Sequence, residues 1–248
     1  MTYEIIQADH HNVLLVDQIG GNFLFRGPNP VEKNDQGDYW FDIEGLKESM
    51  RAAVPSVPQD CRLIDINLLQ LENANEIPMI KAEKDFFDGT PEAGEFHFWE
   101  TQGTAVCAMD DVFASDPSLR NWFAVNLDNW MSDPLIYRVE MLNQWLAGMP
   151  EPTVIYVHCE GGIDRTGELI GAYYLRWLNY TWAEMNAVNF DVANRPFGCN
   201  NYRASLWYCI YLVEALGRQL DYTQAFMCSD PTGPWYACGS PENLPPAE

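Results

Sequence analysis

The stretch VIYVHCEGGIDRTGELIGAYYL, from Val154 to Leu175, decides the fold. It begins with a short apolar run rich in β-branched residues, continues through a loop that holds two glycines, and ends in a helical pattern. This order predicts a buried strand that leads into a loop and then into a helix. Backbone N–H groups at the start of such a helix point into the loop, and together with the helix dipole they favour a bound anion.

Three residue types in this loop fit phosphate chemistry. Cys159 begins the loop, in a setting that favours its thiolate, which is a strong nucleophile. Gly161 and Gly162 allow the backbone to approach a phosphate closely. Arg165 can donate two N–H groups to phosphoryl oxygens at the same time. The loop therefore predicts a cysteine that attacks phosphorus.

The decapeptide HCEGGIDRTG, residues 158–167, resembles the His-Cys-x5-Arg-Thr/Ser-Gly signature of the cysteine-dependent protein tyrosine and dual-specificity phosphatase superfamily. The segment FLFRGPNP, residues 23–30, is similar to an early strand of the compact dual-specificity members. The resemblance implies an α/β fold with a central, mostly parallel sheet flanked by helices, of the dual-specificity phosphatase type. It also implies a phosphoric monoester hydrolase that forms a phosphocysteine intermediate, without a cofactor or a metal.

The resemblance assigns roles to individual residues. Cys159 would be the nucleophile, and Arg165 would stabilise the equatorial phosphoryl oxygens. Thr166 would donate its hydroxyl to the sulfur during the hydrolysis step, and His158 would hydrogen-bond the backbone near the cysteine. The phosphate would be bound by the backbone N–H groups of one continuous loop, namely Glu160, Gly161, Gly162, Ile163, Asp164 and Arg165.

The implied mechanism needs an acid that protonates the leaving oxygen, and members of the superfamily keep an Asp roughly thirty residues before the cysteine. The segment VNLDNWMSDPL, residues 125–135, offers Asp128 and Asp133. We expect Asp128 to be the acid, because it lies at the end of a strand predicted over residues 121–127. Asp133 precedes a proline and a helix, so it has an alternative role as a helix N-cap.

The variable positions of the loop bear on the substrate. Glu160, Ile163 and Asp164 add no positive charge, whereas a polyphosphorylated inositol ring would need extra cations. This favours a phosphotyrosine or phosphoserine/threonine protein or peptide as the partner. The ending with Asp164 before Arg165 also resembles lipid-directed loops, although an acid at a helix N-terminus is stabilised there in any case. A phosphoinositide or inositol phosphate phosphatase is therefore the alternative, and a catalytically silent phosphate-binding module is the second alternative.

Composition limits the remaining classes. The 248 residues are 47% hydrophobic, which is sufficient for a substantial core. Asp and Glu number 36 against 14 Lys and Arg, and the formal net charge of −22 argues against a nucleic-acid partner. We find no apolar stretch of membrane-spanning length and no signal-like start. We therefore expect a cytoplasmic enzyme, while signal-independent secretion or delivery to a host cell stays open.

The pattern along the chain predicts one phosphatase-like catalytic domain over residues 1–228, followed by an irregular, proline-rich tail over residues 229–248. Residues 72–104 are acidic and without clear period, and we interpret them as an insertion that carries long loops. Two early strands are expected around Gly20-Gly21. The other expected elements are a helix over 40–50, a strand over 61–69, a helix over 135–149, a strand over 153–157, and helices over 166–178, 181–189 and 203–216.

The seven cysteines form no Cys-x-x-Cys pair, and the four histidines complete no zinc-ligand spacing. Cys199, Cys228 and Cys238 lie in stretches that contain Gly or Pro, where disulfides could form in an oxidising compartment. Cys61 is a candidate partner that would trap an oxidised Cys159 as a disulfide.

Overall fold

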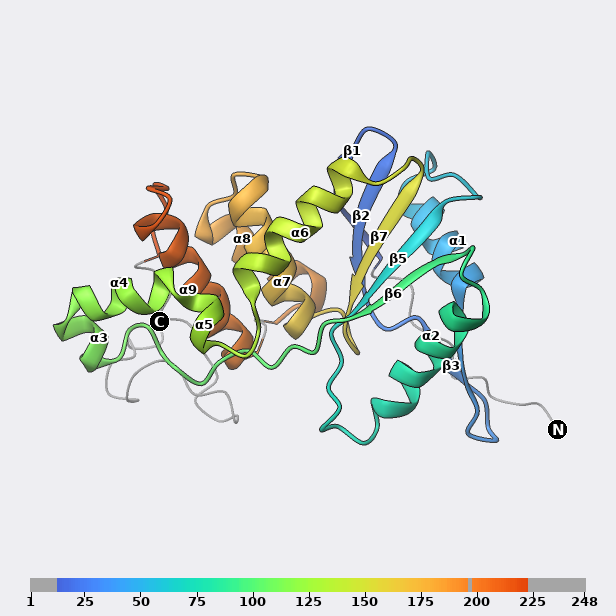
Figure 1. The fold of residues 1–248 in the computed structure, drawn as a ribbon, viewed down its shortest axis with the longest axis horizontal. Helices are drawn as coiled ribbons and strands as arrows, with labels where there is room; N and C mark the ends of the chain where they lie inside the picture. Colours follow the sequence, from blue (N-terminus) through green and yellow to red (C-terminus); the bar gives the residue numbers. More distant parts are fainter. Residues whose placement is uncertain (1–12, 196–197, 223–248) are drawn as a thin grey trace. The chain divides into compact units, whose positions relative to one another are not determined.

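The structure is a computed structural model that describes residues 13–195 and 198–222 (Figure 1). The chain forms two compact units. The first unit contains the chain up to Thr101 together with residues 141–166, and the second contains residues 102–140 and the chain from Gly167 onward.

The first unit is built on a five-stranded sheet in the order β1-β2-β7-β5-β6. Its strands are β1 (Leu14–Ile19), β2 (Asn22–Gly27), β5 (Arg62–Asn67), β6 (Gly94–Phe98) and β7 (Thr153–His158). β1 pairs antiparallel with β2, and all the other pairs are parallel. The expected α/β fold with a mostly parallel central sheet flanked by helices is therefore confirmed.

The register of the sheet brings four strand ends to one edge. His158 at the end of β7 lies opposite Gly27 of β2 on one side and Asn67 of β5 on the other. Asn67 in turn lies opposite Phe98 at the end of β6. Ligand sites of parallel sheets lie outside the carboxyl ends of the strands, so this edge is where a site is expected.

Helices cover both faces of the sheet in the first unit. One face packs against α1 (Ile43–Ala53) and α2 (Ile77–Gly89), and its core is a cluster of buried apolar side chains that includes Phe23, Leu46 and Tyr156. The small hairpin of β3 (Val31–Lys33) and β4 (Tyr39–Phe41) contacts α2. The end of α6 (Leu135–Gly148) contacts the opposite face, where the indole of Trp145 packs on His97 with ring centroids 4.7 Å apart.

The second unit is helical in its described part. Its helices are α3 (Asp111–Ser115), α4 (Pro117–Val125), α5 (Leu127–Trp130), the start of α6, the main part of α7 (Asp164–Trp177), α8 (Trp182–Ala193) and α9 (Cys199–Glu214). α9 is apolar on nearly all sides, and its consecutive residues Leu206, Trp207 and Tyr208 are all fully buried. Over residues 13–195 and 198–222, no helix combines the length and the apolar character that a membrane crossing requires.

Most expected elements are present, including the two strands around Gly20-Gly21, the strands now seen as β5 and β7, and the helices now seen as α6 to α9. The helix expected over residues 40–50 begins only at Ile43, because Asp42 caps it by accepting a hydrogen bond from the N–H of Gly45. Trp40 belongs to β4 instead. The tail over residues 229–248, with Cys238, and Cys228 before it lie outside the described residues.

Two sequence predictions are wrong. Residues 72–104 do not consist of long loops, since they contain α2 and the sheet strand β6. β6 is short and only partly buried at the sheet edge, so its sequence shows little of the apolar alternation that predicts a strand. The strand predicted over residues 121–127 is helical and forms parts of α4 and α5. Its aromatic and β-branched residues favoured a strand, but Asp116 caps α4 by accepting from the N–H groups of Ser118 and Leu119.

Candidate active site

The candidate site is the loop that joins β7 to α7 at the carboxyl edge of the sheet. Cys159 follows the last strand residue directly, and its side chain is buried with 2% exposure. Gly162 has φ of +68°, and a Cβ on it would lie 2.4 Å from backbone atoms of Gly27. Gly161 has no such constraint, because a Cβ there would lie 3.5 Å from the nearest atom. Only the second glycine is therefore required by this backbone path.

Residues at the end of β2 and just after it hold the loop in place. The N–H of Asn29 donates to the carbonyl oxygen of Glu160 over 3.0 Å. Arg26, which is 1% exposed, donates from Nη2 to the carbonyl oxygen of Gly162 over 3.0 Å. Since Arg26 belongs to the FLFRGPNP segment, the two segments that carry the sequence resemblance are in direct contact.

Arg165 is oriented by a carboxylate that the sequence analysis did not single out. Its Nη1 and Nη2 donate to the two oxygens of Glu76 over 2.7 and 2.8 Å, a bidentate arrangement. Burial alone would raise the pKa of Glu76, but the hydrogen bonds from Arg165 and from the N–H of Gln70 hold it below its ordinary value. Burial opposes the charge of Arg165, yet Glu76 and Cys159 raise the pKa of Arg165.

His158 lies under the loop in a buried cluster with two acids. Its Nε2 is 3.1 Å from Oδ1 of Asp65 and 3.3 Å from Oε2 of Glu83, and all three side chains have no exposed surface. Glu83 also accepts from the side-chain amides of Asn29 and Asn67 over 2.6 and 2.5 Å. The ring of His158 thus faces carboxylates, whereas we expected it to hydrogen-bond the backbone near the cysteine.

The charges in this cluster shift two pKa values. Burial by itself would lower the pKa of His158, but the neighbouring carboxylates Glu83 and Asp65 raise it to about 10. Burial and the charge of Glu83 raise the pKa of Asp65 to about 7, against the lowering effect of His158. We interpret the three groups as an ion-paired cluster and not as a metal site, because both oxygens of Glu83 already accept amide hydrogens.

Thr166 follows Arg165 in α7 and is fully buried. Its Oγ1 makes no hydrogen bond within the part of the chain that the structure describes, so the hydroxyl has no competing acceptor there. Among the remaining loop residues, Glu160 is exposed, and Ile163 and Asp164 are half-buried. The side chains of these three loop residues are therefore acidic or apolar.

The two candidate general acids belong to the second unit. Both oxygens of Asp128 accept backbone hydrogen bonds, from the N–H groups of Ile136 and Tyr137, each over 2.8 Å. These N–H groups belong to the first turn of α6, so Asp128 serves the capping role that the sequence suggested for Asp133. Burial raises the pKa of Asp128 despite the lowering effect of these hydrogen bonds.

Asp133 is 1% exposed and occupies a different setting. Its Oδ2 accepts from the N–H groups of Gln102 and Gly103 over 2.9 and 2.6 Å. Its Oδ1 lies 3.7 Å from Nη1 of Arg138. The carboxyl group of Asp133 therefore anchors the backbone of residues 102 and 103 from a buried position.

Cys61 cannot act as the disulfide partner of Cys159. Arg62 lies opposite Thr153 in the sheet, so Cys61 is at the far end of the strands from Cys159. Six to seven residues of strand correspond to roughly 20 Å, whereas bridged cysteines have Cα atoms less than about 7 Å apart. The hypothesis that Cys61 traps an oxidised Cys159 is therefore wrong.

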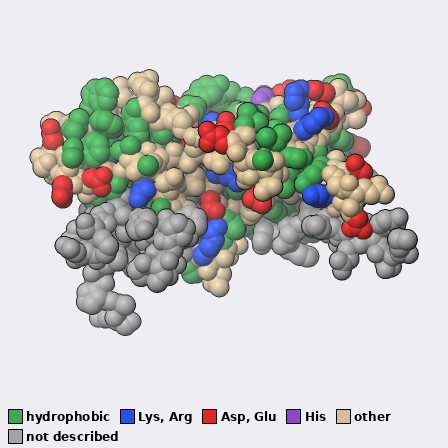
Figure 2. Space-filling view, turned by 90° about the horizontal axis from the view of Figure 1, so that it is seen from below, with side chains coloured by type: hydrophobic (Ala, Val, Ile, Leu, Met, Phe, Trp, Pro, Cys, Tyr) green, Lys and Arg blue, Asp and Glu red, His purple; other side chains and the backbone are tan. Residues whose placement is uncertain are grey.

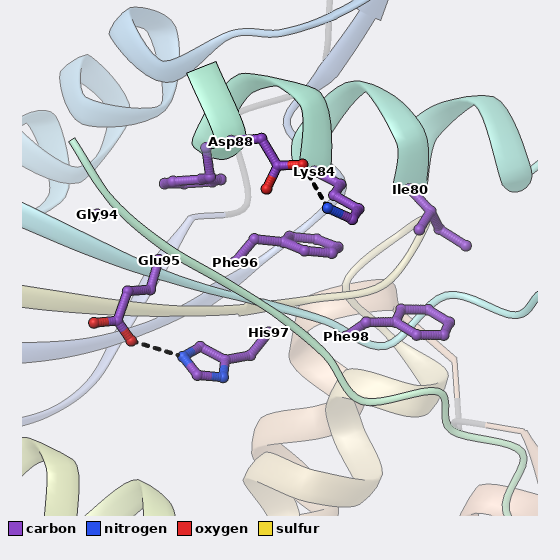
Figure 3. A pocket seen from close by; sticks show the side chains of 9 residues that line it. Ile80, Lys84, Asp88, Gly94, Glu95, Phe96, His97 and Phe98 are labelled. Carbon is purple, nitrogen blue, oxygen red and sulfur yellow. Dashed lines mark hydrogen bonds and ion pairs between the residues drawn. The ribbon is translucent and has the colours of Figure 1, made fainter. Parts of the chain in front are cut away.

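A groove in the first unit lies between α2 and β6 and is separate from this loop (Figure 3). Its walls combine apolar side chains with the Lys84–Asp88 ion pair and the Glu95–His97 hydrogen bond. All of its lining residues come from α2 and β6, and none belongs to the loop of residues 159–165. It is therefore not the predicted phosphate site.

No known family profile and no curated protein sequence matches this chain. Among solved structures, the core catalytic domain of the PP-IP phosphatase SIW14 from S. cerevisiae is similar at 14% identity and a TM-score of 0.42, over 85% of this chain and 90% of that one. The structure of PTPMT1 is similar at 12% identity and a TM-score of 0.40, over 81% and 98% of the two chains. Likenesses this distant do not bear on activity.

Proposed function

We propose that this protein is a cysteine-dependent phosphatase that hydrolyses phosphate monoesters. The observation that carries the proposal is the loop of residues 159–165. A buried cysteine directly follows the central strand, a glycine that tolerates no side chain shapes the loop, and the arginine at its end is held by a bidentate carboxylate. This arrangement supports a role for Cys159 as the nucleophile, and for Arg165 and the loop N–H groups in binding an anion at the carboxyl edge of the sheet.

The proposed reaction has two steps. In the first, the Cys159 thiolate forms a bond to phosphorus while the ester oxygen leaves and takes a proton from a general acid. In the second, a water oxygen bonds to phosphorus and gives a proton to the general acid, which was left ionised by the first step, while the P–S bond breaks and releases the Cys159 thiolate and inorganic phosphate. Arg165 and the loop N–H groups would stabilise the equatorial oxygens in both transition states, and Thr166 would donate to the departing sulfur.

We propose Asp128 as the general acid. A general acid must keep its proton at the working pH, and burial raises the pKa of Asp128. Asp133 is the weaker candidate, because it is almost fully buried and anchors the N–H groups of Gln102 and Gly103, whereas Asp128 is only half-buried.

Phosphorylated proteins or peptides are the substrate class that we propose. Only one cation, Arg165, lies in the loop, and Glu160 and Asp164 would repel additional phosphate groups on an inositol ring. On the face drawn in Figure 2, the Lys and Arg side chains of the described residues are scattered among Asp and Glu. Neither feature supplies the concentrated positive charge that binds a polyphosphorylated headgroup.

The test is phosphate release from a phosphotyrosine peptide, a phosphothreonine peptide and soluble phosphatidylinositol phosphates. Wild type is compared with Cys159→Ser and with the matched control Cys61→Ser, which removes a buried thiol at the opposite sheet edge. We expect release from peptides that is lost in Cys159→Ser, with phosphate-ester binding retained, and kept in Cys61→Ser. Full activity of Cys159→Ser would refute the cysteine mechanism. Release mainly from inositol lipids would refute the substrate class alone.

A further inference from the structure

A buried polar cluster lies directly behind the loop and has no part in the reaction as described above. Asp65 is on β5, Glu83 is on α2, and His158 is the residue before Cys159. The candidate ligand atoms of these three side chains all lie within 4.8 Å of one another. Two acids at this separation, with no exposed surface, share one basic group.

Charge counting shows that the cluster needs an additional proton. Isolated charges are costly to bury, and two carboxylates at close range do not both ionise readily. Protonated His158 neutralises one of the two acids and leaves the other in excess. One acid must therefore be protonated for the cluster to be neutral.

The hydrogen bonds indicate which acid holds this proton. Glu83 accepts two amide N–H groups, from Asn29 and Asn67, in addition to facing His158. Both oxygens of Asp65 are buried without a hydrogen bond of good geometry from the described residues, and its ion-pair neighbour is His158. Donors stabilise a charged carboxylate, so Glu83 carries the charge and Asp65 carries the proton.

Among residues 13–195 and 198–222, the groups around Asp65 include no other one that would replace this proton. The titratable groups that face it are His158 and Tyr156 on β7 and Glu83 on α2. Burial raises the pKa of Tyr156 well above its usual range, so that side chain stays neutral, and its hydroxyl donates to the carbonyl oxygen of Pro28. On β6 the register partner of Asp65 is the uncharged Phe96, and α1 contributes apolar side chains to this face.

We propose that Asp65 and Glu83 are positioning residues that hold one shared proton, keep the floor of the phosphate site neutral, and weaken the site when that proton is lost at alkaline pH. This inference rests on the proposed phosphatase function. Asp65 lies opposite Tyr156 in the sheet, three residues before Cys159, which corresponds to roughly 10 Å. A new negative charge at roughly 10 Å, with an effective dielectric constant of about 20, weakens binding by about tenfold for each negative charge on the phosphate group, and therefore by about a hundredfold for a dianion.

The test compares kcat/KM between about pH 5 and pH 9 for wild type, Asp65→Asn and Glu83→Gln. Asp88→Asn serves as the control, because it removes an exposed carboxylate from the same helix as Glu83. Both cluster variants leave a single acid to pair with His158, so they cannot gain the second negative charge. We expect kcat/KM of Asp65→Asn, divided by that of wild type, to rise by about tenfold to a hundredfold across neutral pH, and the same ratio for Asp88→Asn to stay constant.

A second measurement on the wild-type protein does not depend on activity. Carbon-13 NMR of labelled side-chain carboxyl groups should show one buried carboxyl that titrates near pH 7, and this signal should be missing in Asp65→Asn. Elemental analysis should find no bound metal that responds to mutation of Glu83. The proposal would be overturned if folded Asp65→Asn lost kcat/KM at alkaline pH as wild type does. It would also be overturned if no carboxyl group titrated near neutral pH. Loss of the phosphatase assignment itself would appear separately, as activity that persists in Cys159→Ser.

Discussion

Replacing Gly162 by alanine should disrupt the loop far more than the same change at Gly161. At Gly162 the backbone is left-handed, with φ of +68°, which costs an L-residue about 1–2 kcal/mol. The added Cβ would also lie 2.4 Å from backbone atoms of Gly27 and 2.7 Å from the nitrogen of Pro28. Backbone cannot move aside as a side chain can, so the overlap adds about 1–3 kcal/mol.

The sum predicts a loss of about 2–5 kcal/mol in the free energy of unfolding for Gly162→Ala, which combines the two costs above. With a urea dependence of about 1–3 kcal/mol per molar, the unfolding midpoint should fall by about 1 M or more. Gly161→Ala places its Cβ 3.5 Å from the side chain of Ile163, an ordinary contact, and should change stability by less than about 1 kcal/mol.

The assay is urea unfolding followed by fluorescence, with phosphate release measured on the same samples. Gly162→Ala should lose most of its activity even at low temperature, because the loop can no longer pack against the chain that follows β2. Equal midpoints for the two variants would refute the reasoning, since it depends on the contrast between a blocked position and an open one.

Three further predictions concern charged groups around the proposed reaction. Glu76→Gln should lower kcat/KM by about tenfold or more, because Arg165 loses a charged bidentate partner worth about 1.5–3 kcal/mol. The pKa of Glu76 is held below its ordinary value, so its contribution to stability is present above about pH 4.5 and is lost as the pH falls below that. If urea unfolding still showed wild type to be more stable than Glu76→Gln at lower pH, this account would be wrong. Asp128→Asn should lower kcat by about 10²–10⁴ on substrates with poor leaving groups, and much less when the leaving group is a nitrophenolate. Asp133→Asn should instead lower the midpoint of thermal unfolding, because it weakens the acceptor for the N–H groups of Gln102 and Gly103. If kcat of Asp133→Asn, and not of Asp128→Asn, depended on the leaving group, Asp133 would be the general acid.

The sequence by itself determined the local features of the site. A β-branched run followed by two glycines and a helical pattern was sufficient to predict β7, the loop and α7, because strand and helix periods and glycine preferences act over a few residues. The residue types Cys159 and Arg165 and the expected α/β class follow from the same stretch. The apolar periods were also sufficient for β5, α6 and α9.

Only the tertiary structure decided which distant groups surround the loop. Glu76, Asp65 and Glu83 are three of many acids in an acidic chain, and nothing in their local sequence distinguishes them from exposed ones. They reach the site because β5 lies beside β7 in the sheet and because residues expected to form loops fold into α2.

The misjudged strand over residues 121–127 has the same physical origin. Its apolar side chains suit either a strand or a helix, and the choice depends on the cap at Asp116 and on packing within the second unit. The separation of Cys61 from Cys159 is likewise a matter of strand register, which short-range sequence pattern does not contain. Local pattern therefore specified the loop with its cysteine and arginine, while sheet order and register determined which distant side chains contact them.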